Sequence, residues 1–247
     1  MTLPLIVPDW TVPPGVRAVV TTRVGGVSKA PYDSLNLATH VGDDPFAVAE
    51  NRRLLREALR LPAEPLWLDQ VHGIDVCDAS RPASACRADA AYVDRPGVVL
   101  AVLTADCLPV LLASLDGREI GVAHAGWRGL EAGVLEALLD RFAAPPGEIR
   151  AWLGPAIGPT AFEVGDEVRA AFLAHAPEAA RAFVPTRSGH WLADLYLLTR
   201  QRLAARGIHA VWGGELCTAS DPARFYSYRR DGVTGRMASL IWRDSCS

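Results

Sequence analysis

Hydrophobic positions along the chain predict a series of short buried strands in its central part. Continuous apolar runs cover residues 98–107, 108–115 and 117–127. Runs that are rich in β-branched residues and bounded by turns are typical of strands buried on both faces. The pair Asp116-Gly117 favours a hairpin between the second and third runs. Further strands are expected at residues 16–22, 66–72, 149–153, 208–214 and 237–243.

Other apolar positions are spaced for helices. One helix is predicted from Pro45 to about Arg60, because Asp44 is a suitable N-cap and proline is favoured at the first helical position. Its apolar residues form one stripe: Val48, Leu55 and Leu59. Three more helices are expected at about residues 130–142, 165–175 and 192–206, the last ended by Gly207. Without a repeat, low-complexity tract or linker, this pattern predicts a mixed α/β fold in a single domain over residues 1–247, and it leaves the sheet topology open.

Composition narrows the class of protein. The 247 residues are 50% hydrophobic and 21% charged, with a formal net charge of −3, which gives no sign of a nucleic-acid-binding protein. No apolar run approaches the roughly 18 residues of a membrane span. The first residues carry no positive charge and include Pro4 and Pro8, so no secretory signal is predicted. We therefore expect a cytoplasmic protein.

The cysteines are odd in number and irregularly spaced. In a chain of this size that argues against a disulfide framework, and the question becomes which thiol has a chemical role. The five are Cys77, Cys86, Cys107, Cys217 and Cys246.

Three chemically active residues fall at the ends of predicted strands. His72 lies in DQVHG, Cys107 in TADCLP and His124 in VAHAGWRG, each beside small residues. Two imidazoles and one thiolate suit zinc and leave a fourth tetrahedral position for water or substrate. Zinc would hold Cys107 as a thiolate. The separations of 35 and 17 residues match no short metal-binding motif, so the spacing alone carries little weight.

The same residues have other interpretations. Each could be structural: His124 a core histidine between two alanines, Cys107 an inert buried thiol, and His72 a loop residue. Cys107 and His124 could also act as nucleophile and base without metal, as in thiol amidases and deamidases. A zinc-stabilised structural or partner-binding protein is a further alternative.

Several arginines are candidates for binding an anion. Arg23 precedes a glycine turn, and Arg128 stands at a predicted helix start, where backbone amides and the helix dipole favour anions. Arg229 and Arg230 lie with Arg236 in SYRRDGVTGR. Surface solvation or a structural ion pair is the plainer interpretation of each. Phosphate-loop and dinucleotide motifs are absent from the sequence.

Taken together, these motifs resemble those of a known family. TTRVGGVSKAPYDSLNLATHVGDDP, DQVHG, TADCLPVLL, VAHAGWRGL, GPAIGPTAFEVG and FYSYRRDGVTGRMASLIW are similar to the YfiH-like family, in the same order over almost the whole chain. That family was long described as multicopper polyphenol oxidoreductases with a laccase domain, and is now described as purine nucleoside phosphorylases. Its fold is an α/β unit of layered mixed sheets resembling the catalytic domain of cytotoxic necrotizing factor, a thiol deamidase.

The resemblance implies a zinc enzyme whose ligands match His72, Cys107 and His124. It implies phosphorolysis of adenosine, inosine and S-methyl-5′-thioadenosine, and deamination of adenosine to inosine. A laccase needs roughly ten histidine ligands, mostly in closely spaced pairs. This chain has six histidines and no His-x-His pair, so the older description fits poorly. Copper could still occupy the three-residue site, because it binds such sites more tightly than zinc, and weak polyphenol oxidation would follow.

Phosphorolysis assigns expected roles to further residues. Arg23 and Arg128 are the leading candidates to hold phosphate, followed by Arg229 and Arg230. Two aspartates could act as proton shuttles or as partners of a ligating histidine: Asp106 and Asp89. Asn36 and Gln70 are candidates for hydrogen bonds to sugar or base. The expected partners are purine nucleosides and phosphate, with no nucleic acid and no membrane, and the oligomeric state is left open.

Overall fold

Two six-stranded mixed sheets form the centre of the computed structural model, which describes residues 3–81 and 86–244. The first sheet has the order β1-β2-β15-β7-β3-β5. Its strands are Leu5–Ile6, Val16–Thr21, Met237–Arg243, Val99–Thr104, Leu66–Asp69 and Cys86–Arg87 in that order. The second sheet has the order β14-β10-β8-β9-β6-β4. Its strands are Val211–Gly213, Ile149–Leu153, Leu108–Ser114, Ile120–Ala125, Ala90–Val93 and Val76–Asp78.

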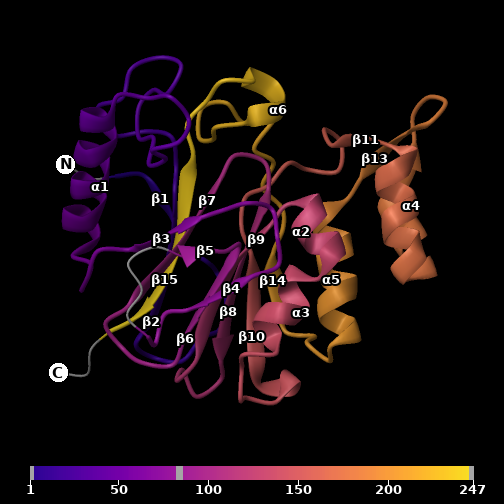
Figure 1. Cartoon of the computed structure of the whole chain (residues 1–247), viewed down its shortest axis with the longest axis horizontal. Helices are drawn as coiled ribbons and strands as arrows, with labels where there is room; N and C mark the ends of the chain where they lie inside the picture. The colour runs from indigo at the N-terminus through magenta and orange to yellow at the C-terminus, as the bar shows by residue number, and fades with distance from the viewer. Residues whose placement is uncertain (1–2, 82–85, 245–247) are drawn as a thin grey trace.

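The two sheets pack face to face between outer helices, which gives four layers (Figure 1). Helix α1 (Pro45–Leu59) covers the first sheet, and α2 (Trp127–Ala132), α3 (Val134–Leu139) and α5 (Leu195–Ala205) lie on the side of the second. A small antiparallel sheet projects with helix α4 (Asp166–His175) beyond them. Its strands are β11 (Glu163–Gly165), β13 (His190–Ala193) and β12 (Phe183–Pro185). Helix α6 (Tyr228–Asp231) lies at the opposite end from the C-terminus.

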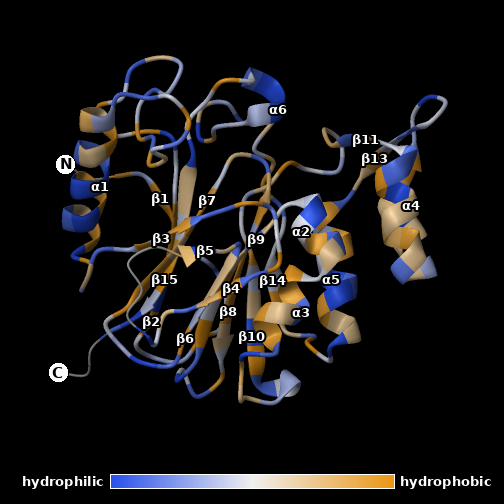
Figure 2. Cartoon of the chain, in the orientation of Figure 1, coloured by the Kyte–Doolittle hydropathy of each residue, from blue (hydrophilic) through white to orange (hydrophobic). Residues whose placement is uncertain are grey.

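Alternation along the central strands explains the layers. In β8, Leu111 and Ala113 face the core between the sheets, whereas Leu108, Val110 and Leu112 face the core under the helices. Both sets are buried, because this sheet is covered on both sides. Figure 2 shows hydrophobic residues concentrated on these central strands and polar residues on α6 and the outer side of α1. No helix in the described ranges is long and apolar enough to cross a bilayer.

The expected mixed α/β class is confirmed, and most of the predicted central elements are present. The side chain of Asp44 accepts a hydrogen bond from Phe46 N and begins α1, as its position before proline predicts. Strands β8 and β9 pair antiparallel around the turn at Asp116 and Gly117. All residues of β7, β8 and β9 are buried.

Three predicted elements have different bounds. The helix expected at residues 130–142 is two short helices, because Gly133 adopts φ 106° between α2 and α3. The helix expected from residue 192 begins at Leu195, since the preceding residues pair in β13. Strand β3 ends at Asp69, three residues before His72.

The absence of a disulfide was a wrong expectation: Cys77 and Cys86 are bonded. Cys77 lies in β4 and Cys86 in β5, which are edge strands of the two different sheets. Packing of the sheets brings the two sulfur atoms together, and the odd cysteine count carries no information about that contact. Cys107 and Cys217 are free, and Cys246 lies outside the described residues.

Removal of this disulfide is expected to destabilise the protein. Replacing both Cys77 and Cys86 with alanine should lower the free energy of unfolding by about 2–3 kcal/mol, because a bond closing a short loop restricts the unfolded chain. Urea unfolding of wild type with and without dithiothreitol measures the effect, and the double variant should not respond to the reductant. Equal stability of oxidised wild type and the variant would contradict a stabilising role.

Candidate metal centre and active site

The fold brings His72, Cys107 and His124 together. Their ligand atoms all lie within 4.8 Å of one another. Cys107 Sγ is 3.8 Å from His72 Nε2, and the two imidazole rings meet edge to face with centroids 4.8 Å apart. His72 follows β3 and Cys107 links β7 to β8, while His124 lies in β9. The cluster therefore forms where the two sheets meet.

Local backbone geometry allows this close approach. A Cβ atom on Gly126 would lie 2.9 Å from Cys107 Sγ and 3.1 Å from His72 Cδ2, so only glycine fits beside the cluster. His72 itself has φ 61°, a left-handed conformation that is uncommon for residues other than glycine. Asp106, the residue before Cys107, has φ 90°. Residues held in such conformations are concentrated at functional sites.

Asp89 organises two of the three candidate ligands. Its fully buried carboxylate accepts hydrogen bonds from the backbone N–H groups of Val71, His72 and Gly73, at 3.0, 2.9 and 2.7 Å. It also lies 2.8 Å from His124 Nδ1. A proton on Nδ1 satisfies this contact and leaves His124 Nε2 as the available ligand atom. The carboxylate thus fixes both the loop that carries His72 and the orientation of His124.

The electrostatics favour a thiolate at the cluster. Burial raises the pKa of the Cys107 thiol, but His124 and His72 outweigh burial and bring this pKa to about 6. Burial lowers the pKa of His124, yet the Cys107 thiolate and Asp89 raise it to about 9. For Asp89, burial opposes ionisation, but the hydrogen bonds from His124 and the loop hold its pKa below the usual value. These residues fit a divalent metal, because two imidazoles and a thiolate backed by a carboxylate form a typical zinc donor set.

A cavity of about 420 Å³ opens onto the cluster. This volume falls within the range of small-molecule sites, about 300–1,000 Å³. Besides the three clustered residues, the cavity is lined by His40, Gln70, Leu103, Thr104, Ala105, Tyr228 and Arg236. Thr104 is buried, and its hydroxyl has no hydrogen-bond partner among the residues that the structure describes. The lining therefore combines apolar surface with a few polar groups.

Arg236 and His40 line the cavity, although the sequence analysis gave neither of them a role. Arg236 Nη1 donates to the carbonyls of Thr234 and Gly235, and no carboxylate of the described residues pairs with this guanidinium. Burial lowers the pKa of Arg236, but an arginine still remains charged. Burial and the neighbouring Arg236 also lower the pKa of His40, so its imidazole is neutral near pH 7. Arg236 was visible in SYRRDGVTGR, although nothing there distinguishes it from its neighbours.

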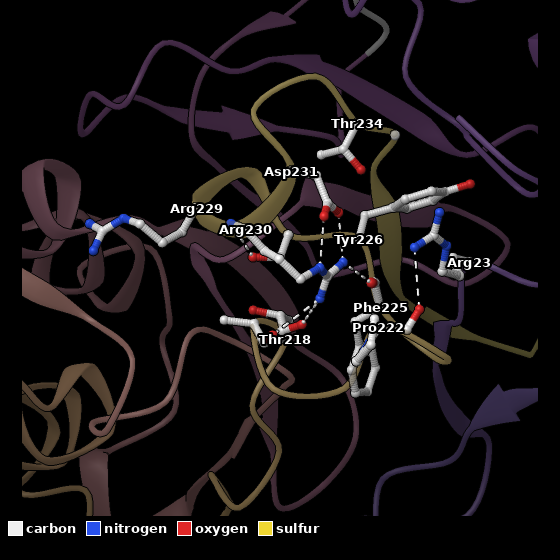
Figure 3. Close-up of polar contacts among 12 residues, drawn as sticks. Arg23, Thr218, Pro222, Phe225, Tyr226, Arg229, Arg230, Asp231 and Thr234 are labelled. Carbon is white, nitrogen blue, oxygen red and sulfur yellow. Dashed lines mark hydrogen bonds and ion pairs between the residues drawn. The ribbon is translucent and has the colours of Figure 1, made fainter. Parts of the chain in front are cut away.

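The four predicted phosphate arginines do not line the cavity. Arg23 donates to the carbonyls of Asp33 and Pro222, and Arg230 donates to those of Thr218 and Phe225 (Figure 3). Arg229 points away from Arg230 in the same view. Arg128 is exposed, with its guanidinium stacked on the Trp127 ring. Arg23 and Arg230 thus hold neighbouring segments of the chain together through hydrogen bonds to backbone carbonyls.

The other predicted site residues, Asp106, Asn36 and Gln70, mostly make hydrogen bonds within the protein around the site. Asp106 accepts hydrogen bonds from Thr218 Oγ1 and from the backbone N–H of Arg229, both at 2.6 Å. The buried side chain of Asn36 accepts from the backbone N–H of Arg236. Gln70 lines the cavity, and both ends of its amide bond to the backbone of Leu103.

Comparison with known proteins places the chain in a family. Residues 17–244 match the family described as multi-copper polyphenol oxidoreductase laccase. A protein of Pseudomonas aeruginosa named purine nucleoside phosphorylase is 58% identical over 238 residues, covering 96% of this chain and 97% of that protein. The purine nucleoside phosphorylase YfiH of Escherichia coli is 56% identical over 239 residues, covering 96% and 98%.

Solved structures show the same fold. A protein of Neisseria meningitidis superposes with a TM-score of 0.94 at 48% identity, over 98% of this chain and 99% of that one. YlmD of Geobacillus stearothermophilus superposes with a TM-score of 0.86 at 36% identity, over 94% and 93%. The chain therefore belongs to the YfiH-like family, whose model is described as a multi-copper polyphenol oxidoreductase laccase and whose curated relatives are named purine nucleoside phosphorylases.

Proposed function

We propose that the protein is a zinc-dependent purine nucleoside phosphorylase acting on adenosine, inosine and S-methyl-5′-thioadenosine, with adenosine deaminase activity at the same centre. The observation that carries this proposal is a His-Cys-His cluster opening onto a cavity that also holds Arg236, which pairs with no carboxylate of the described residues. The names of the relatives support the reaction class. His72, Cys107 and His124 are the proposed zinc ligands.

In phosphorolysis, a phosphate oxygen bonds to the ribose anomeric carbon as the glycosidic bond breaks and its electron pair leaves with the purine. Zinc at the cluster would supply Lewis-acid polarisation of a substrate oxygen. Arg236 holds the phosphate dianion, and the neutral His40 donates or accepts a further hydrogen bond there. Asp89 keeps His124 oriented rather than moving a proton, because its oxygens are already engaged.

Incubation of the purified protein with inosine and phosphate tests the proposal. Formation of hypoxanthine and ribose 1-phosphate in equal amounts is the expected result, and adenosine should yield both adenine and inosine. Copper in place of zinc would give weak polyphenol oxidation instead, so metal content is measured on the same sample. Failure to consume any purine nucleoside with zinc bound would rule out the proposed function.

The role of Arg236 can be separated from those of the other arginines. Arg236→Ala should raise the KM for phosphate about 10- to 100-fold, because a charge-assisted hydrogen-bonded contact contributes about 1.5–3 kcal/mol. The KM for inosine and the zinc content should change little. Arg128→Ala is the matched control, since that guanidinium is exposed outside the cavity. An unchanged phosphate KM in Arg236→Ala, or a large rise in the control, would contradict the assignment.

A further inference from the structure

Tyr228 gives the cavity one exposed aromatic face. It lines the cavity, and 61% of its surface remains exposed. Its hydroxyl makes no hydrogen bond with the residues that the structure describes, so polar contacts do not account for its position. Single exposed aromatic residues are common, and exposure alone therefore says little about function. The evidence for a role lies in how Tyr228 is held.

The backbone of Tyr228 is tied to the metal cluster through Asp106. Asp106 immediately precedes Cys107, and its Oδ2 accepts the backbone N–H of Arg229, the residue after Tyr228, at 2.6 Å. Its Oδ1 accepts the hydroxyl of Thr218 at 2.6 Å. The Asp106 carboxylate that accepts these hydrogen bonds is buried, and the backbone of Asp106 has φ 90°. Tyr228 is therefore placed at a fixed distance from Cys107 although 121 residues separate them in sequence.

A second set of contacts also holds helix α6. Ser227 caps the helix by accepting the backbone N–H of Arg230 at 3.2 Å. The Arg230 guanidinium donates to the carbonyls of Thr218 and Phe225 and pairs with Asp231 (Figure 3). These contacts stabilise a helix of four residues that would not form alone. Several part-buried contacts thus hold α6, and with it the exposed ring of Tyr228, at the cavity.

The position of the ring relative to Arg236 indicates what it contacts. The Arg236 guanidinium lies 5.9 Å from the centroid of the Tyr228 ring. A phosphate held by Arg236 must reach the anomeric carbon of the nucleoside, and the purine is attached to that same carbon. The base therefore lies within one sugar of the guanidinium, which is the neighbourhood of Tyr228.

We propose that Tyr228 stacks on the purine base of the substrate, as a base-binding residue within the proposed phosphorylase function. Stacking recognises the π face that all purines share and does not depend on the 6-amino or 6-oxo group. This explains how one site accepts both adenosine and inosine. It also assigns a function to Asp106 and Arg230, which position α6 without touching the substrate.

The test separates base binding from sugar phosphate binding. Tyr228→Ala should weaken inhibition by hypoxanthine about 5- to 150-fold, the range that base-aromatic stacking provides, and leave inhibition by ribose 1-phosphate within about two-fold of wild type. Tyr228→Phe retains the ring and should restore hypoxanthine affinity. Phe46→Ala removes another exposed aromatic residue, at the start of α1 and outside the cavity, and serves as the control.

Each outcome is decisive. Unchanged hypoxanthine affinity in Tyr228→Ala, equal weakening of both inhibitors, or a Tyr228→Phe variant as weak as alanine would overturn the stacking role while phosphorolysis by wild type stands. Direct titration of hypoxanthine by calorimetry gives the same comparison without turnover. If wild-type protein with zinc bound consumes no purine nucleoside, the proposed function fails and the stacking role fails with it.

Discussion

Cys107→Ala is expected not to bind the proposed zinc ion and to retain less than about a thousandth of the wild-type phosphorolysis rate. The alanine variant removes the one thiolate from the donor set and leaves two imidazoles, and loss of several kcal/mol of metal-dependent stabilisation corresponds to a factor of this size. The same result is expected for His124→Ala. Elemental analysis of the purified variants measures zinc, and product formation from inosine measures the rate.

Cys217→Ala is the matched control for this experiment. Cys217 is the other free cysteine of the described ranges, and it is also partly buried, but it does not line the cavity. We expect wild-type zinc content and activity from this variant. Full zinc loading of both Cys107→Ala and His124→Ala would remove these residues from the ligand set.

The same protein samples distinguish a zinc phosphorylase from the metal-free alternative, a thiol amidase or deamidase. Cys107 has an acidic thiol beside two histidines, which is also the arrangement of a thiol amidase or deamidase. In that case one equivalent of iodoacetamide would abolish activity and a chelator would have no effect. A zinc phosphorylase is expected to lose activity to the chelator and to recover it when zinc is restored.

Asp89→Ala is expected to have the largest effect on stability. It leaves the Val71, His72 and Gly73 N–H groups and the His124 ring without their common acceptor. Removing one partner from a buried charged network lowers the free energy of unfolding by about 3–5 kcal/mol. Zinc affinity should also fall about 10- to 100-fold, as it does when the partner of a ligating histidine is removed.

Chemical denaturation and a zinc-competition titration measure these two changes. Asp75→Ala is the control, because this aspartate is exposed and lies in the loop that carries His72. Asp89→Asn keeps the volume of the side chain and should retain part of the stability while still weakening zinc. Wild-type stability and zinc affinity in Asp89→Ala would show that the carboxylate network is dispensable.

The buried centre of the fold could be predicted from the sequence. Strands covered on both faces need continuous apolar runs, and those of β7, β8 and β9 are visible directly. The start of α1 is set by local chemistry at Asp44 and Pro45. The strands that were missed have only two to four residues, which carry too little periodicity to be recognised, and all but β6 lie at a sheet edge or in the small third sheet. They are β1, β4, β5, β6, β11, β12 and β13.

The candidate site was predictable only in part. His124 lies near the end of the buried strand β9, Cys107 lies between the buried strands β7 and β8, and His72 follows the partly buried strand β3 by three residues. The ends of these strands meet at the cluster. Arginines carry no such signal: whether a guanidinium binds a carbonyl or faces a cavity depends on tertiary contacts. Arg230 and Arg236 lie six residues apart, yet only the second lines the cavity.

The ligand cluster also couples the two halves of the sandwich. His72 follows a strand of the first sheet and His124 lies in a strand of the second. Cys107 lies in the short connection from β7 of the first sheet to β8 of the second. A bound ion would therefore cross-link the two sheets, and a shift of one sheet relative to the other would distort the coordination of the ion. Substitutions in the core between the two sheets would then alter catalysis without contacting the substrate, because they would shift the two histidines relative to each other.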